Sequence, residues 1–156
     1  MTLKQMVFLA LAGSVAVMLG AIGSQYLGGL LPCKLCIWQR WPHGIAIALG
    51  LVWLVYRDRR LPLLAGLVVL AGAGIGVYHA GVEQAWWPGP DTCTAGSIGG
   101  LTTDELLDKI LNTPVIRCDD IQWSLFGLTM AAWNALISVV LAGLWFTAYA
   151  SSSASQ

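Results

Sequence analysis

Residues 61–82 read LPLLAGLVVLAGAGIGVYHAGV, a stretch without any aspartate, glutamate, lysine or arginine. A helix that crosses the hydrocarbon core of a bilayer needs about 20 mostly apolar residues, and this stretch is long enough. Three further stretches lack charged side chains in the same way, namely 5–33, 41–56 and 121–156. The sequence therefore predicts an all-α integral membrane protein, a four-helix bundle in the lipid bilayer.

The overall composition favours the same class of protein. Hydrophobic residues make up 57% of the chain, charged residues only 10%, and the mean hydropathy is +0.72, which excludes an ordinary soluble domain. The eight basic and eight acidic side chains balance to a net charge of zero, so no nucleic-acid partner is expected.

The expected helices form a single membrane domain, residues 1–150, followed by a disordered polar tail at 151–156. Their approximate bounds are 3–27, 37–56, 61–79 and 124–149. The charge-free window at 41–56 would span only about 24 Å against a core of about 30 Å, so its helix should extend back past Arg40. Residues 1–24 could instead be a cleaved secretory signal, but the charge-free run continues to Cys33, which favours a retained helix.

The orientation of the bundle follows from the distribution of basic residues. Lys4, Arg57, Arg59 and Arg60 lie on the side of the termini, and Lys34, Arg40, Lys109 and Arg117 on the other. The two sides carry equal numbers of basic residues, so their density decides the orientation. Three arginines lie in the short 57–60 turn, and basic residues in long loops contribute less. We expect both termini in the cytoplasm and two cysteine-bearing loops in the periplasm, an oxidising compartment where disulfides persist.

The longer of these loops, residues 80–123, contains a predicted short helix. Thr102-Thr103-Asp104-Glu105 has the pattern of a capping box, and an apolar stripe follows it before Pro114. The sequence predicts an amphipathic helix over 103–112. Its stripe could lie on the membrane surface or pack on the rest of the loop, and the pattern alone does not separate these alternatives.

The first pair of cysteines has the spacing of a redox site. In Cys33-Lys34-Leu35-Cys36 two thiols can close a small ring, and a position before a helix stabilises the thiolate through the positive helix end. Arg40 follows Cys36 by four residues and would share its helix face. Its guanidinium could stabilise a thiolate or an anion on a bound acceptor, or it could simply reach the lipid headgroups.

The second pair, Cys93 and Cys118, is not defined by any spacing rule. It could be a purely structural disulfide, which is the commoner role in exported proteins, or a second redox pair. A zinc site made of all four cysteines is disfavoured because this pair lacks the close Cys-x-x-Cys spacing, and no metal is expected.

Several motifs together resemble one known family, the bacterial disulfide bond formation protein B (DsbB) family. They are CKLCIWQRW at 33–41, YHAGVE at 78–83, WPGP at 87–90, Arg117-Cys118-Asp119 and WSLFGL at 123–128. The resemblance covers nearly the whole chain in order. It implies an inner-membrane protein that reoxidises a soluble, thioredoxin-like periplasmic dithiol oxidase and passes the electrons to ubiquinone or menaquinone.

The resemblance also assigns roles to the cysteines. Cys93 is similar to the loop cysteine that the partner's thiolate attacks, and Cys118 to the thiol that leaves. Cys118 would then attack Cys33 and release Cys36 as the thiolate that donates to the quinone.

Two cofactor-binding residues follow from the same resemblance. Arg40 corresponds to an arginine beside the quinone, and His79 to a histidine near it; by itself His79 could be an interfacial histidine. The stretch 83–90 fits a subgroup of the family better than its best-known members.

Two other classes of protein remain as alternatives. A vitamin K epoxide reductase-like enzyme would also combine four helices, a Cys-x-x-Cys and a quinone, but in that class the loop pair precedes the Cys-x-x-Cys, whereas here it follows. A non-enzymatic membrane protein with structural disulfides would need no quinone and would tolerate permanent oxidation of all four thiols.

Overall fold

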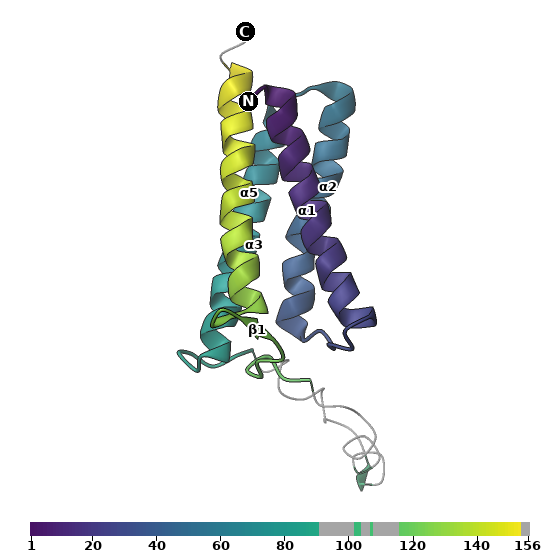
Figure 1. The fold of residues 1–156 in the computed structure, drawn as a ribbon, viewed down its shortest axis with the longest axis vertical. Helices are drawn as coiled ribbons and strands as arrows, with labels where there is room; N and C mark the ends of the chain where they lie inside the picture. The colour runs from purple at the N-terminus through teal and green to yellow at the C-terminus, as the bar shows by residue number, and fades with distance from the viewer. Residues whose placement is uncertain (91–101, 104–106, 108–115, 154–156) are drawn as a thin grey trace.

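Four long helices lie side by side in the computed structural model, which describes residues 1–90, 102–103, 107 and 116–153 (Figure 1). They are α1 (Leu3–Tyr26), α2 (Lys34–Tyr56), α3 (Arg60–Glu83) and α5 (Met130–Ser153). Both termini and the α2–α3 turn lie at one end, and the α1–α2 connection and the chain that leads into α5 lie at the other (Figure 1). The predicted all-α four-helix architecture is confirmed.

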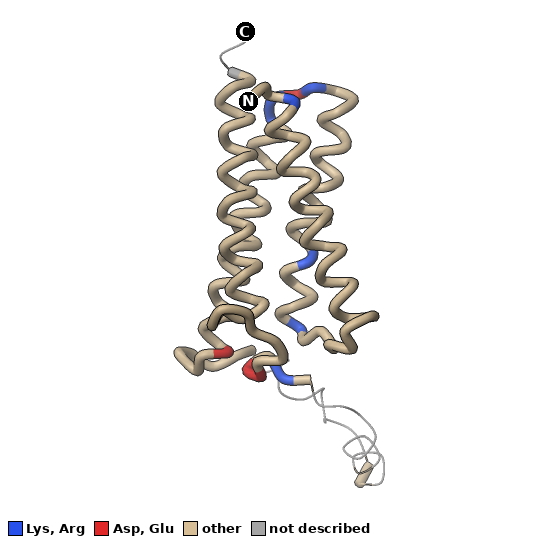
Figure 2. Tube along the Cα trace, viewed as in Figure 1, with Lys and Arg blue, Asp and Glu red and all other residues tan. Residues whose placement is uncertain are grey.

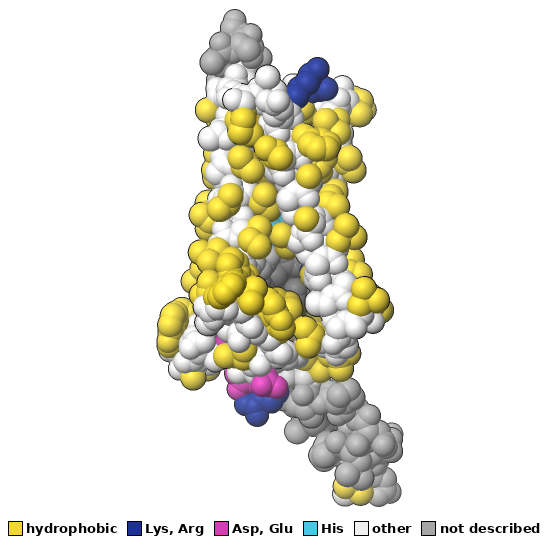
Figure 3. Space-filling view, viewed as in Figure 1, with side chains coloured by type: hydrophobic (Ala, Val, Ile, Leu, Met, Phe, Trp, Pro, Cys, Tyr) yellow, Lys and Arg dark blue, Asp and Glu magenta, His cyan; other side chains and the backbone are white. Residues whose placement is uncertain are grey.

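The surface of the bundle is that of a membrane protein. Helices α1, α3 and α5 are long and apolar enough to cross a bilayer, with mean hydropathies of 2.2, 2.1 and 1.6. Large apolar side chains such as Phe8, Val55 and Leu67 point outward, and hydrophobic side chains cover the visible face of the helices (Figure 3). Charged residues gather mainly at the two ends of the bundle, and its middle is almost free of them (Figure 2). An apolar exterior of this extent fits lipid and not water.

Helix α2 starts at Lys34, three residues earlier than the expected start at 37. The reason is a cap: the Cys33 sulfur accepts a hydrogen bond from the Cys36 amide, which satisfies one of the free donors of the first turn. Pro42 lies inside the helix and packs where Gly72 of α3 leaves room. Arg40 is therefore a residue of the helix body, as the length argument required.

The start of the last helix was predicted wrongly. Strands β1 (Ser124–Leu125) and β2 (Leu128–Thr129) form a small antiparallel hairpin, and α5 begins only at Met130. The two residues between the strands, Phe126 and Gly127, have φ angles of 53° and 77°, the combination that a tight type I′ turn requires. This left-handed backbone excludes a helix over the same residues.

Three other boundaries differ from the expectation or remain untested. Helix α3 continues to Glu83 instead of ending at 79, because its last turn is held by the polar contacts described below. Helix α5 continues to Ser153, so the tail predicted from 151 begins too early. The amphipathic helix expected over 103–112 falls largely outside the described residues.

Small residues allow the helices to pack closely. The core contains Val7 and Ala10 of α1, Ala46 and Trp53 of α2, Val69 of α3, and Trp145 and Ala148 of α5. Helix α1 packs against both α2 and α5. Gly76 of α3 lies against the backbone of α5, where an added Cβ would lie 3.0 Å from the Ala135 Cβ and 3.1 Å from its Cα. Such contacts are how membrane helices associate without a hydrophobic driving force between them.

The substitution Gly76→Ala should therefore destabilise the bundle by about 1–3 kcal/mol, because the backbone of α5 must move to admit the methyl group. Thermal unfolding in detergent measures the change. Gly74→Ala is the matched control: its added Cβ meets nothing within 4 Å, and alanine is the better helix former, so stability should be unchanged or slightly higher. Equal melting temperatures of the Gly76→Ala and Gly74→Ala variants would contradict the close α3–α5 contact.

Candidate functional site: a dithiol above an apolar cavity

Two free thiols stand at the beginning of α2. Cys33 and Cys36 are not bonded to each other, and their sulfur atoms are 3.0 Å apart. Cys33 is buried, with 3% of its surface exposed, and Cys36 is partly buried. Since a disulfide needs sulfur atoms about 2.05 Å apart, a small movement would close the bond, as the Cys-x-x-Cys spacing predicted.

The surroundings of Cys33 favour its anionic form. Its sulfur lies within hydrogen-bond distance of the Cys36 sulfur, at 3.0 Å, and 3.5 Å from His79 Nε2, and it accepts a hydrogen bond from the Cys36 amide at 3.3 Å. The bond from the Cys36 thiol, with those from His79 and the helix amide, lowers the pKa of the Cys33 thiol, although burial acts in the opposite direction. Cys33 can therefore serve as a thiolate nucleophile or leaving group at neutral pH.

Cys118, far away in the sequence, lies beside this pair. It is disulfide-bonded, only 1% exposed, and packs in one buried cluster with Cys33, Leu35 and Val82. The structure thus brings the second cysteine site onto the first. Cys93 falls outside the described residues, so the Cys93–Cys118 pairing stays a prediction.

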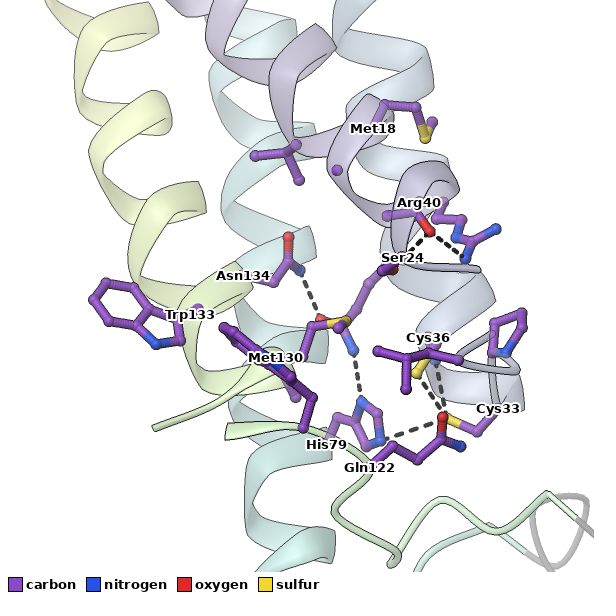
Figure 4. A pocket seen from close by; sticks show the side chains of 18 of the residues that line it. Met18, Ser24, Cys33, Cys36, Arg40, His79, Gln122, Met130, Trp133 and Asn134 are labelled. Carbon is purple, nitrogen blue, oxygen red and sulfur yellow. Dashed lines mark hydrogen bonds between the residues drawn. The ribbon is translucent and has the colours of Figure 1, made fainter. Parts of the chain in front are cut away.

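His79 lies at the centre of the site, between Cys33 and the segment of Cys118 (Figure 4). Its Nε2 is 3.2 Å from the Cys118 carbonyl oxygen and 3.8 Å from Glu83 Oε1, one turn further along α3. Glu83 also accepts a hydrogen bond from the Thr129 hydroxyl of β2. These contacts extend α3 beyond the expected end at 79 and attach the hairpin to it.

A chain of polar side chains runs from His79 into the bundle. The Gln39 amide nitrogen lies 2.7 Å from His79 Nδ1, and the Asn134 amide donates to Gln39 Oε1 at 2.6 Å. His43 Nε2 lies 3.1 Å from Asn134 Oδ1. Sequence analysis missed Gln39, His43, Glu83 and Asn134. The available signal was their polarity inside or at the ends of otherwise apolar spans, where such residues are usually functional.

Arg40 connects α2 to α1. Its guanidinium donates to the Gln25 side-chain oxygen at 2.7 Å and to the Ala21 carbonyl at 3.2 Å. Its Nε is buried and finds no acceptor in the described part of the chain. Arg40 is therefore held by neighbouring protein groups and keeps one donor free, which differs from an arginine that only reaches for headgroups.

A cavity of about 530 Å³ opens beside these groups (Figure 4). Its polar lining includes Cys33, Cys36, Gln39, Arg40, His79 and Asn134. Most of the remaining lining is apolar, with Val17, Met18, Met130, Trp133 and Ile137 from α1 and α5. A few directed polar groups in a mostly apolar hollow are typical of a site for a small organic molecule. Cys118 is disulfide-bonded in this structure and so offers no thiolate to a zinc ion.

A buried dithiol at the start of a membrane helix, in contact with a second, disulfide-bonded cysteine, defines a membrane thiol oxidoreductase. Comparison with known proteins gives the same result. Residues 3–148 match the model of the family described as Disulfide bond formation protein DsbB. The chain belongs to the DsbB family, as the resemblance of its motifs implied.

Individual relatives agree with the family. The chain is 30% identical to Disulfide bond formation protein B 2 of Pseudomonas entomophila, over 90% of this chain and 88% of the relative. It is 31% identical to Disulfide bond formation protein B of a Polaromonas species, over 87% and 86% of the two chains. An uncharacterized protein of Rickettsia prowazekii is 22% identical over 76% of this chain and 71% of its own. No solved structure matches the chain.

Proposed function

We propose that this protein oxidises a soluble, thioredoxin-like dithiol oxidase and passes the two electrons to a membrane quinone, either ubiquinone or menaquinone. The observation that carries the proposal is the position of the dithiol: Cys33 lies in one buried cluster with Cys118, and both Cys33 and Cys36 line the apolar cavity. Electrons that enter through the loop cysteines would leave toward the lipid-accessible part of the bundle.

The residues around the cavity suit a quinone headgroup. The ring would contact the apolar lining, and the free Nε–H of Arg40 would donate to one of its oxygens. A bound quinone supplies an acceptor for two electrons and two protons. An acceptor of this kind is needed because a strongly oxidising partner, at roughly −120 mV, cannot be reoxidised by an ordinary Cys-x-x-Cys disulfide alone.

The cysteines act in sequence by thiol–disulfide exchange. The partner's thiolate attacks Cys93, a mixed disulfide forms, and the electron pair of the broken bond leaves on Cys118. Before this exchange the two free thiols would have been oxidised by the quinone to a Cys33–Cys36 disulfide. The Cys118 thiolate then attacks Cys33, a member of the same buried cluster, and the Cys33–Cys36 bond breaks. Cys36 receives the electron pair as a thiolate beside the cavity.

The proposed location is the bacterial inner membrane, with both termini in the cytoplasm and the cysteine loops in the periplasm. In support, the termini and the arginine-rich α2–α3 turn share one end of the bundle, and the dithiol lies at the other (Figures 1 and 2). The two alternative classes fit less well, since the family differs from the vitamin K epoxide reductase class and the free Cys33 and Cys36 argue against permanent disulfides.

The direct test combines the purified protein, a quinone and a reduced dithiol partner, with quinone reduction followed by absorbance. Reduction should require all three components. If the partner is oxidised without any change in the quinone, or if no quinone supports turnover, the electron acceptor proposed here is wrong.

The substitution Arg40→Ala should weaken quinone use about ten- to a hundredfold, which corresponds to the loss of one hydrogen bond to a charged group, about 1.5–3 kcal/mol. Partner binding should change little, because Arg40 lies deeper than the loop cysteines. The apparent affinity and turnover with quinone measure the effect.

Gln25→Ala is the matched control for Arg40→Ala. It removes the main α1 acceptor of the guanidinium and leaves the guanidinium itself in place. If both variants lose quinone use equally, Arg40 acts by joining α1 to α2. If neither changes it, the arginine has no part in quinone binding.

A further inference from the structure

The hydrogen position on His79 follows from its neighbours. Nε2 faces the Cys33 sulfur, the Cys118 carbonyl oxygen and a Glu83 carboxylate oxygen, at 3.5, 3.2 and 3.8 Å. A carbonyl oxygen can only accept a hydrogen bond, so Nε2 carries a hydrogen. The same N–H therefore points at the backbone of one cysteine and the sulfur of another.

Gln39 holds His79 in this tautomer. Its side-chain oxygen accepts from the Asn134 amide at 2.6 Å, so its amide nitrogen is the atom that faces His79 Nδ1 at 2.7 Å. Nδ1 must then accept, which leaves the ring hydrogen on Nε2. His43 continues the chain by donating to Asn134 Oδ1, so every donor in it points toward Cys33.

The chain is shielded from solvent. His79 is 3% exposed, Gln39 6% and His43 1%. In such surroundings hydrogen bonds are stronger, and successive donors polarise one another, which increases the stabilisation of an anion at the end of the chain. The end of this chain is the Cys33 sulfur.

We propose that His79 is a catalytic residue of the thiol exchange: its Nε2–H stabilises the Cys33 thiolate and holds the Cys118 backbone beside that sulfur, with Gln39 as the positioning residue. This inference rests on the proposed function and assigns His79 a role toward the thiols in addition to its place in the cavity wall.

The step it assists is the release of Cys33 from Cys118. The second thiolate of the dithiol partner first attacks its own sulfur in the mixed disulfide, which completes the partner's disulfide and releases Cys93 as a thiolate. When the Cys93 thiolate then attacks Cys118 in a Cys33–Cys118 disulfide, a Cys93–Cys118 bond forms and the Cys33–Cys118 bond breaks. The electron pair moves to the Cys33 sulfur, and no proton is required. The His79 N–H already lies where this negative charge develops, as does the Cys36 amide at 3.3 Å.

Other charged and titratable groups line the same cavity as Cys33, and the test must separate them from His79. They are Cys36 and Arg40 from α2, Glu83 from α3, and Arg117 and Asp120 from the chain that precedes the hairpin. A background with Cys36→Ser, Cys93→Ser and Cys118→Ser removes the other thiols and keeps the Cys118 backbone. The remaining groups are common to all variants, so differences between variants report on His79 and Gln39.

The experiment is the alkylation rate of Cys33 against pH in this background, without quinone or partner. In this background the His79 Nε2–H and the backbone amide of residue 36 still favour the Cys33 thiolate, so the alkylation rate should stay high below the ordinary pKa of a thiol and drop only at a lower pH. His79→Leu should raise the midpoint by about one to two pH units, which is about ten- to a hundredfold less thiolate on the acidic side. His79→Gln, whose amide can still donate, should recover most of the shift. Ser14→Ala removes a buried hydroxyl outside the cavity lining and should leave the midpoint unchanged.

Gln39 provides a second test that does not alter His79. Gln39→Leu should raise the midpoint, because the tautomer is no longer fixed, whereas Gln39→Glu should lower it, because a carboxylate draws a second proton onto the ring. The proposal is overturned if His79→Leu titrates like the parent, or if His79→Gln is no better than His79→Leu. Should His79→Leu fail to fold, the absence of opposite shifts in the two Gln39 variants overturns it. Quinone reduction by the unsubstituted protein decides the proposed function separately.

Discussion

Cys118→Ser is expected to abolish oxidation of the dithiol partner while Cys33 and Cys36 remain able to react with quinone. Cys118 is the described cysteine of the loop, and it is buried against Cys33, so its sulfur is the bridge between the two sites. Without it, electrons from the partner have no route to the dithiol. The rates of partner oxidation and of quinone reduction are measured separately. Cys118→Ser should lower the first rate by several orders of magnitude and leave the second almost unchanged.

Cys93→Ser should have the same effect, because exchange needs both members of the loop pair. A small dithiol reductant serves as the control, since it can reduce Cys33–Cys36 directly and should support quinone reduction in both variants. If either variant still oxidises the partner at the wild-type rate, the loop pair is structural and the relay is wrong.

The spans were predictable because charged residues are excluded from the bilayer core, and the sequence shows where they are missing. The error at the last helix has an equally physical cause. Residues 124–129 are charge-free and largely apolar, and nothing in hydropathy distinguishes a hairpin from a helix there. The distinguishing feature is the positive φ at Phe126 and Gly127, for which the glycine was the only local indication.

The cysteines of the site could be found from sequence because their chemistry is specific to the residue type. The chain of polar side chains that runs from His79 into the bundle could not be found from the sequence. Gln39 and Asn134 are 95 residues apart, and their contact depends on how α2 and α5 are rotated about their axes. The helices carry apolar side chains on nearly all sides, so periodicity does not define the inner face. Only the structure shows that each of these polar groups has a partner.

This chain also explains how α2 tolerates its polar residues. Gln39, Arg40 and His43 fall within two turns of one helix, and unpaired they would be costly in a bilayer. Each has a hydrogen-bond partner on another helix: Gln39 on α3 and α5, Arg40 on α1, and His43 on α5. The helix that starts with the dithiol is thereby fixed to all three others, which holds the two sulfurs in position.

Cys33→Ser should stop the relay at an identifiable point. Cys118 would lose its target, so either a mixed disulfide between Cys93 and the partner or the reduced loop pair should accumulate, and quinone reduction should cease. The reason is that His79 ties Cys33 to Cys118: its Nε2 lies 3.5 Å from the Cys33 sulfur and 3.2 Å from the Cys118 carbonyl oxygen, whereas Cys36 only packs against their buried cluster. Denaturing gels without reductant and mass spectrometry of the linked peptides identify the trapped species.

Cys36→Ser is the matched control, because it keeps the thiol that contacts Cys118 and removes the other. An internal Cys33–Cys118 disulfide should form in this variant, whereas no Cys36–Cys118 disulfide should form in Cys33→Ser. In the Cys33→Ser variant, a membrane-impermeant thiol reagent should label reduced Cys93 and Cys118 from the periplasmic side only. Labelling from the cytoplasm would invert the topology. A Cys36–Cys118 link, or quinone reduction that survives in Cys33→Ser, would refute the order of transfer, because electrons would then reach Cys36 without passing through the sulfur that packs beside Cys118.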